Sequence, residues 1–363
     1  MIFKYLVFKC VTPEFMEIKE INEFLKNNNL PEYRLKQIIK AVYRDGVSCF
    51  SEITTIPKEL REKMGKEIKI LSFKAENVLE ASNKKSFKAL LKLADGNYIE
   101  TVLLSPLSDH WSACVSSQAG CSLGCKFCAT GNSGFKRNLT NEEITDQILF
   151  WKQFIKKNNL AGSFHGIVFM GMGEPFMNYE AVAKSIKSLM DAGLFNFGAR
   201  HISVSTAGLP EGIKRLAKDF PQVNLAISLA TANDEKRSEL MPINKAHKLA
   251  GIKKALDYYF NRTNRKVFLE YIMLEDVNDK RNDADNLIKF INSNSKPNLL
   301  HVNLIRYNAA VSGLKPSKDE TVKWFKEYLA KNKISATVRK SLGQEIQAAC
   351  GQLAGENTKT QKH

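Results

Sequence analysis

The 363-residue sequence contains no run of about 18 consecutive apolar residues, the length that a helix needs to span a membrane. The apolar start, Met1–Val11, is short and soon interrupted, so it does not have the pattern of a secretion signal. These two absences predict a cytoplasmic protein without a membrane partner.

Cysteine is scarce, and its number is odd: seven residues, grouped mainly around one segment. A secreted disulfide scaffold would carry an even number spread over the chain, so we expect a reducing compartment. Cys10 and Cys49 lie in unremarkable surroundings, and we assign neither of them a role.

Acidic residues are also in deficit, with 38 Asp and Glu against 54 Lys and Arg, which gives a formal net charge of +16. Such an excess favours a polyanionic partner, and nucleic acid is the leading candidate. A lysine-rich surface that only serves solubility remains the alternative.

Three thiols fall within eight residues, at Cys121, Cys125 and Cys128. A four-iron cluster offers one thiolate position on each iron, so three cysteines leave one iron open to a small molecule. The spacing, with Phe127 before the last cysteine, resembles the signature of radical S-adenosylmethionine (SAM) enzymes. A structural zinc site stays open as an alternative, because Cys114 could supply a fourth ligand.

The N-terminal segment has helical periodicity. Apolar residues recur from Leu35 to Tyr43 at the spacing of an amphipathic helix, and a shorter helix is expected over Ile18–Leu25. Lys36, Lys40 and Arg44 lie four apart on the other side, so this small bundle presents a basic face that could contact RNA phosphates. A merely solvated face is the alternative.

Two alternating segments follow, at 86–93 and 98–104, on either side of Asp95-Gly96-Asn97; they predict a β-hairpin. The rest of the chain alternates strands with helices. Strands are expected at 113–117, 166–170, 201–206, 223–229, 266–274 and 300–305, and helices at 142–155, 179–190, 252–259 and 283–291. About six βα units of this kind predict an α/β fold, namely an open, partial TIM-type (β/α)6 barrel with functional residues at the carboxyl ends of its strands. A dinucleotide-binding sheet is disfavoured, because Gly171-x-Gly173 lacks the third glycine.

We divide the chain accordingly. The expected units are an N-terminal helical, RNA-binding domain (1–66), a β-hairpin connector (67–110), the barrel (111–340), a loop around Cys350 (341–355) and a disordered tail (356–363).

Polar and glycine-rich motifs follow the expected strands. In Gly171–Pro175, two glycines allow a close approach to backbone, and Glu174 could accept a hydrogen bond from an amino group. Asn308 could bind ribose or adenine after the sixth strand. Cys350 stands among small residues and glycines, which predicts an accessible loop that folds over the barrel mouth.

Five segments together carry a family resemblance: Cys114–Cys121, the three-cysteine run, Met170–Pro175, Leu240–Asn244 and Ala348–Leu353. In combination they resemble the radical SAM dual-specificity 23S rRNA/tRNA adenine-C2 methyltransferases, over residues 16–355. The resemblance implies a cytoplasmic, monomeric enzyme that methylates C2 of an adenosine in the peptidyl-transferase centre of 23S rRNA, and of the adenosine beside the tRNA anticodon. A close relative methylates C8 of the same rRNA adenosine. Pro175 favours C2.

The resemblance also implies cofactors and roles. The cofactors are a [4Fe-4S] cluster with three cysteine ligands and two molecules of SAM per turnover, with a flavodoxin-like or ferredoxin-like electron donor. Cys350 would carry the methyl group as S-methylcysteine, Cys114 would release the protein–RNA adduct by forming a transient disulfide with Cys350, and Glu100 would accept the C2 proton. This route fits the chemistry, because the electron-poor C2 carbon cannot attack the methyl group of SAM. The implied SAM contacts are Gly173, Glu174, Ser205, Ser228, Leu229, Ala230 and Asn308.

One position departs from the family pattern, since Ala230 stands where the family usually has histidine; only backbone or packing contacts can remain there. Two other classes of protein stay open. A radical-generating activase would need neither Cys114 nor Cys350, and a non-catalytic ribosome-binding metalloprotein would hold zinc without labile iron and sulfide.

Overall fold

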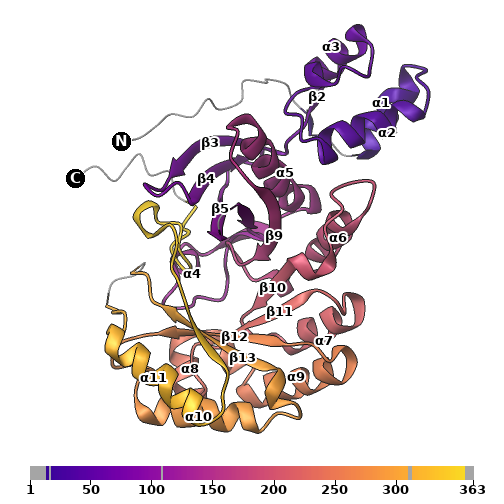
Figure 1. The fold of residues 1–363 in the computed structure, drawn as a ribbon. Coiled ribbons are helices and arrows are strands. Elements are labelled where there is room, and N and C mark those ends of the chain that lie inside the picture. The colour runs from indigo at the N-terminus through magenta and orange to yellow at the C-terminus, as the bar shows by residue number, and fades with distance from the viewer. Residues whose placement is uncertain (1–13, 16–17, 108, 310–312, 356–363) are drawn as a thin grey trace.

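The computed structural model describes residues 14–15, 18–107, 109–309 and 313–355. Its centre is a ten-stranded mixed sheet in the order β14-β13-β12-β11-β10-β9-β6-β5-β4-β3 (Figure 1). The strands of this sheet are β3 (Phe73–Glu80), β4 (Ser86–Leu93), β5 (Tyr98–Leu107), β6 (His110–Cys114), β9 (Ser163–Phe169), β10 (Ile202–Thr206), β11 (Asn224–Ser228), β12 (Val267–Met273), β13 (Leu300–Arg306) and β14 (Ala336–Arg339).

Parallel pairing runs from β6 to β14, and a helix precedes each next parallel strand. These helices are α5 (Asn141–Lys157), α6 (Tyr179–Met190), α7 (Pro210–Asp219), α9 (Leu249–Thr263), α10 (Arg281–Asn292) and α11 (Asp319–Lys331). The repeated βα units and the open, partial barrel are therefore confirmed. A seventh parallel strand, β14, was not predicted.

The predicted hairpin is β4 and β5, but it is not an isolated connector. β5 pairs antiparallel with β6, so the hairpin extends the main sheet, and β3 adds a further antiparallel strand. The register shifts between Ala75 and Asn77, which breaks the alternation of buried and exposed residues and hides β3 from a sequence pattern.

The first parallel strand ends earlier than expected. We predicted a strand over 113–117, but β6 ends at Cys114. Beyond it, the Ser116 N–H donates to Gln147 Oε1 (2.8 Å) and the Ser116 hydroxyl donates to the Glu100 carbonyl (2.6 Å), so side chains replace the strand ladder.

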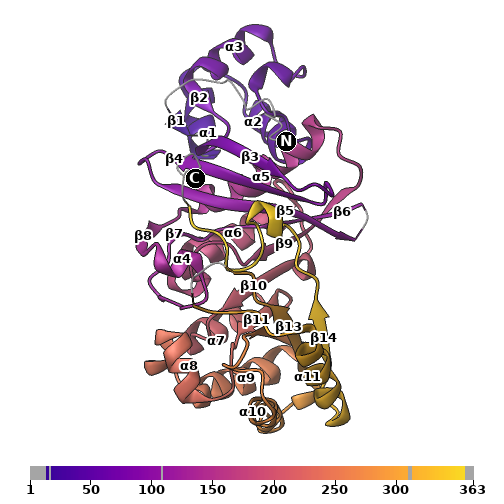
Figure 2. The same cartoon turned by 90° about the vertical axis from the view of Figure 1, so that its left-hand side faces the viewer.

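The N-terminal helices form a separate layer at one end of the molecule (Figures 1 and 2). They are α1 (Ile18–Asn27), α2 (Tyr33–Ile39) continued by a π-helical turn at Lys40–Arg44, and α3 (Lys58–Glu67); the two-residue strands β1 (Glu14–Phe15) and β2 (Ile68–Lys69) pair beside them. The bundle is joined to α5, since Lys152 Nζ donates to the Tyr43 carbonyl (2.7 Å) and Gln153 Nε2 to the Val47 carbonyl (2.8 Å).

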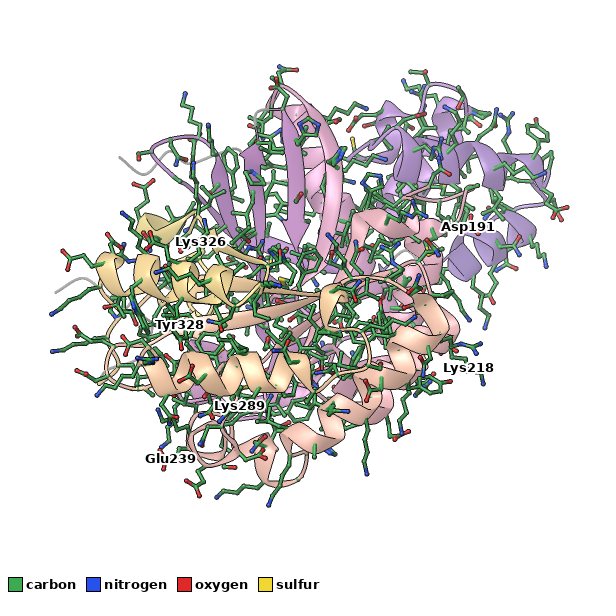
Figure 3. All side chains as sticks on the ribbon, turned by 60° about the horizontal axis from the view of Figure 1, so that its bottom comes forward. Asp191, Lys218, Glu239, Lys289, Lys326 and Tyr328 are labelled. Carbon is green, nitrogen blue, oxygen red and sulfur yellow. The ribbon has the colours of Figure 1, made fainter. Side chains whose placement is uncertain are left out.

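The opposite end is closed by α10 and α11, which lie side by side (Figure 3). The Tyr328 hydroxyl on α11 donates to Asp285 Oδ1 on α10 (2.7 Å), and its ring stacks on Trp324. Short elements complete the fold: β7 (Gln118–Gly120), β8 (Phe135–Asn138), α4 (Ala129–Asn132) and α8 (Asp234–Leu240).

Among the helices of the described residues, none is both long and apolar enough to cross a membrane. The expected tail at 356–363 and Cys10 lie outside the described residues.

Candidate active site

One cavity opens at the carboxyl ends of the parallel strands, with a volume of about 1020 Å³ including its open mouth. It brings together side chains from loops far apart in the sequence. Most of the predicted site residues line it, namely Cys121, Cys125, Cys128, Gly173, Glu174, Ser205, Ser228, Ala230 and Cys350.

The three-cysteine loop is fixed at its base by the antiparallel pair β7–β8. Gly120 (φ +74°) ends β7, and a Cβ there would lie 1.8 Å from the Gly134 carbonyl oxygen, so only glycine fits. The loop is held further along by the Lys126 N–H, which donates to the Leu240 carbonyl (2.9 Å). This contact gives the 240–244 motif a structural role beside the cysteines.

Burial raises the pKa of each of two cysteine thiols, Cys121 to about 11 and Cys125 further. A thiol in such surroundings ionises when a metal replaces its proton. In the described part of the chain, no three Cys, His, Asp or Glu side chains converge closely enough to hold one metal ion. A structural zinc needs four donors around one point, whereas cluster thiolates bind different irons. Three thiols that share a cavity without meeting at one point therefore fit a cluster better than zinc.

The Gly171–Pro175 turn lies across from this loop. Gly173 has φ +95°, and a Cβ on it would lie 2.5 Å from Gln118 Cβ. Gln118, which sequence reasoning missed, accepts a hydrogen bond from the Glu174 N–H (2.8 Å). The buried Glu174 carboxylate accepts from the N–H groups of Phe176 (3.0 Å) and Ala207 (2.7 Å), and burial raises its pKa to about 7.

The next two strand ends supply hydroxyls. Ser205 and Ser228 lie with their Oγ atoms 3.2 Å apart. Leu229 is fully buried and is not among the lining residues; its N–H donates to the Glu270 carbonyl (3.0 Å). Ala230 lines the cavity with φ +60°, and its carbonyl accepts from Asn278 Nδ2 (2.7 Å).

A fully buried arginine organises these loops. Arg237 donates to the carbonyls of Leu229 (3.0 Å) and Ala207 (2.5 Å) and to Asn244 Oδ1 (2.8 Å), and burial lowers its pKa to about 10. Arg237 stands among other charged residues and nothing there marks it as buried, so its role could not be predicted from local pattern.

Cys350 enters the cavity from the C-terminal loop, which lies beside α4 and β5 (Figure 2). The loop is tied to the cysteine loop, since the Ala129 N–H donates to the Gly351 carbonyl (2.8 Å) and the Thr130 hydroxyl to the Leu353 carbonyl (2.5 Å). Cys350 is exposed as a whole residue, but its thiol points inward enough that desolvation by the surrounding protein raises the pKa of the thiol.

Cys114 is buried at the end of β6 and is not among the lining residues. Burial raises the pKa of its thiol, and the neighbouring Cys350 raises it further. The two thiols are therefore close enough to interact electrostatically, and both are free.

Two further predicted residues hold the C-terminal loop and do not line the cavity. Glu100 pairs with the buried Lys88 (2.8 Å), and its Oε2 accepts from the N–H groups of Ala354 (2.7 Å) and Gly355 (3.2 Å). Asn308 Nδ2 donates to the Cys350 carbonyl at 3.4 Å.

Two charged residues of the cavity were not predicted. Glu270 on β12 lies beside Arg339 at the end of β14, with Oε2 and Nη1 3.5 Å apart. A charged residue inside the apolar run Val267–Met273 was a usable signal, because such a strand is otherwise buried on both faces.

The predicted basic face of the N-terminal bundle is exposed, but two of its three side chains already bind other groups of the protein. Lys40 pairs with Asp45 (2.9 Å), and Arg44 Nη1 donates to the Ala192 carbonyl (3.2 Å). Lys36 is exposed.

Comparison with known proteins gives two family matches. Residues 115–291 match the Radical SAM superfamily, and residues 16–70 match the Ribosomal RNA large subunit methyltransferase N-terminal domain.

Curated relatives cover nearly the whole chain. The chain is 42% identical to Ribosomal RNA large subunit methyltransferase Cfr of Clostridium botulinum over 340 residues, covering 93% of this chain and 97% of the relative. It is 39% identical to the Cfr protein of Shouchella clausii, covering 93% of this chain and 95% of that relative. Among solved structures, a radical SAM methyltransferase from Sphaerobacter thermophilus has 36% identity and a TM-score of 0.87, covering 95% of this chain and 100% of that one.

Proposed function

Because this chain belongs to the radical SAM ribosomal RNA large subunit methyltransferases, for which a [4Fe-4S] cluster and SAM are the implied cofactors, we propose that it methylates an adenosine of 23S rRNA through two cysteines of its own. The observation that carries this proposal is the position of Cys350, which shares one cavity with the three-cysteine loop and interacts electrostatically with the buried Cys114. An enzyme that only generated radicals would not need a separate thiol in that cavity.

The cavity residues divide into two groups by role. Cys121, Cys125 and Cys128 would be the three protein ligands of the cluster, which supplies the electron that cleaves SAM. Glu174, already held by two backbone N–H groups, would accept a hydrogen bond from the amino group of SAM, and Gly173 would let that group come close. Ser205 and Ser228 present hydroxyls for the rest of SAM, together with the backbone of the Ser228–Ala230 strip. Asn308, which does not line the cavity in the described arrangement, is proposed as a further SAM contact.

The two thiols have distinct tasks. Cys350 is accessible from the cavity, so it can attack the methyl group of one SAM as a thiolate and carry it as a thioether. A radical from the second SAM would take one hydrogen atom from this S-methyl group, so that its carbon could bond to the adenine, and the adduct would then give up the ring proton and return one electron to the cluster. The buried Cys114 would next attack the Cys350 sulfur, and the freed carbon would take up a proton. The carbon–sulfur bond breaks, a disulfide forms, and the methylated base is released.

Glu100 is proposed to accept the proton that leaves the adenine carbon. In the described arrangement its carboxylate is bound by Lys88 and by two N–H groups of the C-terminal loop. The proton can reach Glu100 only when residues 354–355 shift away, and that shift would also move Cys350 on the same loop.

We propose C2 as the methylated carbon, on the presence of Pro175, with the adenosine beside the tRNA anticodon as a second substrate. C8 is the second candidate, because the resemblance to C8-methylating relatives covers most of the same motifs. A monomer, a cytoplasmic location and a flavodoxin-like or ferredoxin-like donor complete the proposal.

Nucleoside mass spectrometry tests it. Reduced, anaerobic enzyme is incubated with SAM and with unmodified rRNA or tRNA, and the digests are compared with 2-methyladenosine and 8-methyladenosine. We expect 2-methyladenosine from wild type and none from Cys350→Ala. SAM cleavage without any methylated adenosine would instead support the activase.

A further inference from the structure

Glu270 is the least satisfied charged group of the cavity. Its side chain is 7% exposed, and its Oε1 accepts a hydrogen bond from Asn303 Nδ2 (2.9 Å). Its Oε2 is buried and has no hydrogen-bond donor among the described residues. A buried carboxylate oxygen without a donor is costly, so a structural acid would not be expected to keep one.

The orientation of this carboxylate is fixed from behind. The Thr337 hydroxyl donates to Asn303 Oδ1 (2.9 Å), which sets Asn303 with its amide nitrogen toward Glu270. The three residues come from the neighbouring strands β12, β13 and β14, at paired register positions. This chain of hydrogen bonds occupies Oε1 and leaves Oε2 beside the Arg339 side chain, which lines the same cavity.

Arg339 does not supply the missing hydrogen bond to Glu270 Oε2. Its Nη1 lies 3.5 Å from Oε2, outside good hydrogen-bond geometry, and its side chain is 46% exposed. An ion pair with one solvated partner contributes little. Oε2 itself has almost no accessible surface, so a molecule in the cavity reaches it when the half-exposed Arg339 side chain turns away.

The surroundings indicate which kind of molecule. Ile272 and Ile305 line the cavity with apolar side chains, and Ser228 pairs with Glu270 in register on the adjacent strand. Apolar contacts suit the face of a purine, while a carboxylate suits the N–H and O–H groups at the edge of a nucleoside.

We infer that Glu270 is a nucleoside-recognition residue, whose Oε2 accepts a hydrogen bond from an exocyclic amino group or ribose hydroxyl beside Cys350. The shared chemistry is a nucleoside donor, and the two sources are SAM and the target adenosine; naming these two rests on the proposed function. Asn303 is the positioning residue for this carboxylate.

Glu270→Gln tests the inference without changing the size of the side chain. Asn303 Nδ2 would hold the amide oxygen, so the amide NH₂ would face the cavity and meet the nucleoside donor with another donor. A hydrogen bond to a charged group contributes about 1.5–3 kcal/mol, so we expect an affinity loss of roughly tenfold to a hundredfold. The matched control is Glu275→Gln, just beyond the same strand, where the carboxylate pairs with Lys318 at 3.8 Å and does not line the cavity.

Two arms separate the sources. Equilibrium dialysis of SAM with cluster-loaded enzyme needs no RNA, and weaker binding by Glu270→Gln alone assigns the contact to SAM. Unchanged SAM binding with weaker binding of substrate RNA assigns it to the target adenosine. Both affinities within twofold of the control would overturn the inference, whether or not the wild type methylates RNA.

Wild-type enzyme provides a second measurement in case the variant folds poorly. SAM analogues and RNAs lacking the 6-amino group or one ribose hydroxyl are compared with the parent ligands. One of these deletions should weaken binding to wild type by about tenfold or more. The same deletion should not weaken binding to Glu270→Gln any further. Equal binding of every analogue by wild type would refute the inference without any variant.

Discussion

Lys88→Met should destabilise the fold, and loss of Glu100 as well should detach the C-terminal loop. Lys88 and Glu100 are 4% and 3% exposed and form an ion pair at 2.8 Å. Removing one partner of a buried pair typically costs about 3–5 kcal/mol, because the other charge stays buried. Since Glu100 keeps the N–H groups of Ala354 and Gly355, we expect the lower end, about 3 kcal/mol.

Urea unfolding and amide hydrogen exchange measure the two effects. Lys92→Met is the matched control, because Lys92 lies exposed on the same strand, and its loss should change stability by less than about 0.5 kcal/mol. Replacing both Lys88 and Glu100 by Met should recover much of the stability but leave the amides of 354–355 unprotected. Equal stability of Lys88→Met and Lys92→Met, or unchanged exchange at 354–355 in the double variant, would refute this reasoning.

Three other predictions concern pH, SAM and RNA. Burial raises the pKa of Asp146 to about 7, so between about pH 4 and pH 7 the folded state binds a proton that the unfolded state has lost. The protonated Asp146 therefore contributes its full stabilisation of the fold below about pH 4, and this contribution is lost as pH rises to about 7. The free energy of unfolding, measured with urea at several pH values, should fall by up to about 4 kcal/mol over this range in wild type and should not fall in Asp146→Asn. The same pH profile in both proteins would count against the raised pKa of Asp146. Gly173→Ala should weaken SAM binding at least tenfold in equilibrium dialysis, because its Cβ would collide with Gln118, whereas Gly96→Ala at an open turn should bind SAM normally. Lys36→Glu should lower the slope of log affinity for RNA against log salt by about one, compared with Lys289→Glu on α10; equal slopes would make the basic face a solvated one.

Much of the fold followed from local patterns, but interactions between distant strands did not. The βα alternation and the cysteine run predicted the barrel and the residues at its mouth. Lys88 stands in an alternating strand, where a lysine normally faces solvent, and its burial depends on the pairing of β4 with β5. α3 buries only Leu60 and Met64, too few residues to form a recognisable stripe.

The site was predicted best where a motif is contiguous. Glu174 and the three cysteines belong to short motifs, and each lines the cavity. Glu100 and Asn308 instead contact the C-terminal loop, because that loop folds back from more than 40 residues away, which no local pattern encodes. Arg237 acts through the loops around it, so its role required the tertiary structure. Glu270 could have been noticed as a charge in an apolar strand, but its contacts with Asn303 and Arg339 required the strand pairing.

The two-cysteine assignment is tested most directly by looking for a protein–RNA cross-link in two variants. With Cys114→Ala, Cys350 should still be methylated and the reaction should stall as a covalent adduct, whose digest contains a Cys350 peptide joined through one carbon to adenosine. With Cys350→Ala, neither adduct nor methylated RNA should form. Methylated RNA from Cys350→Ala, or an adduct through Cys114, would contradict the account.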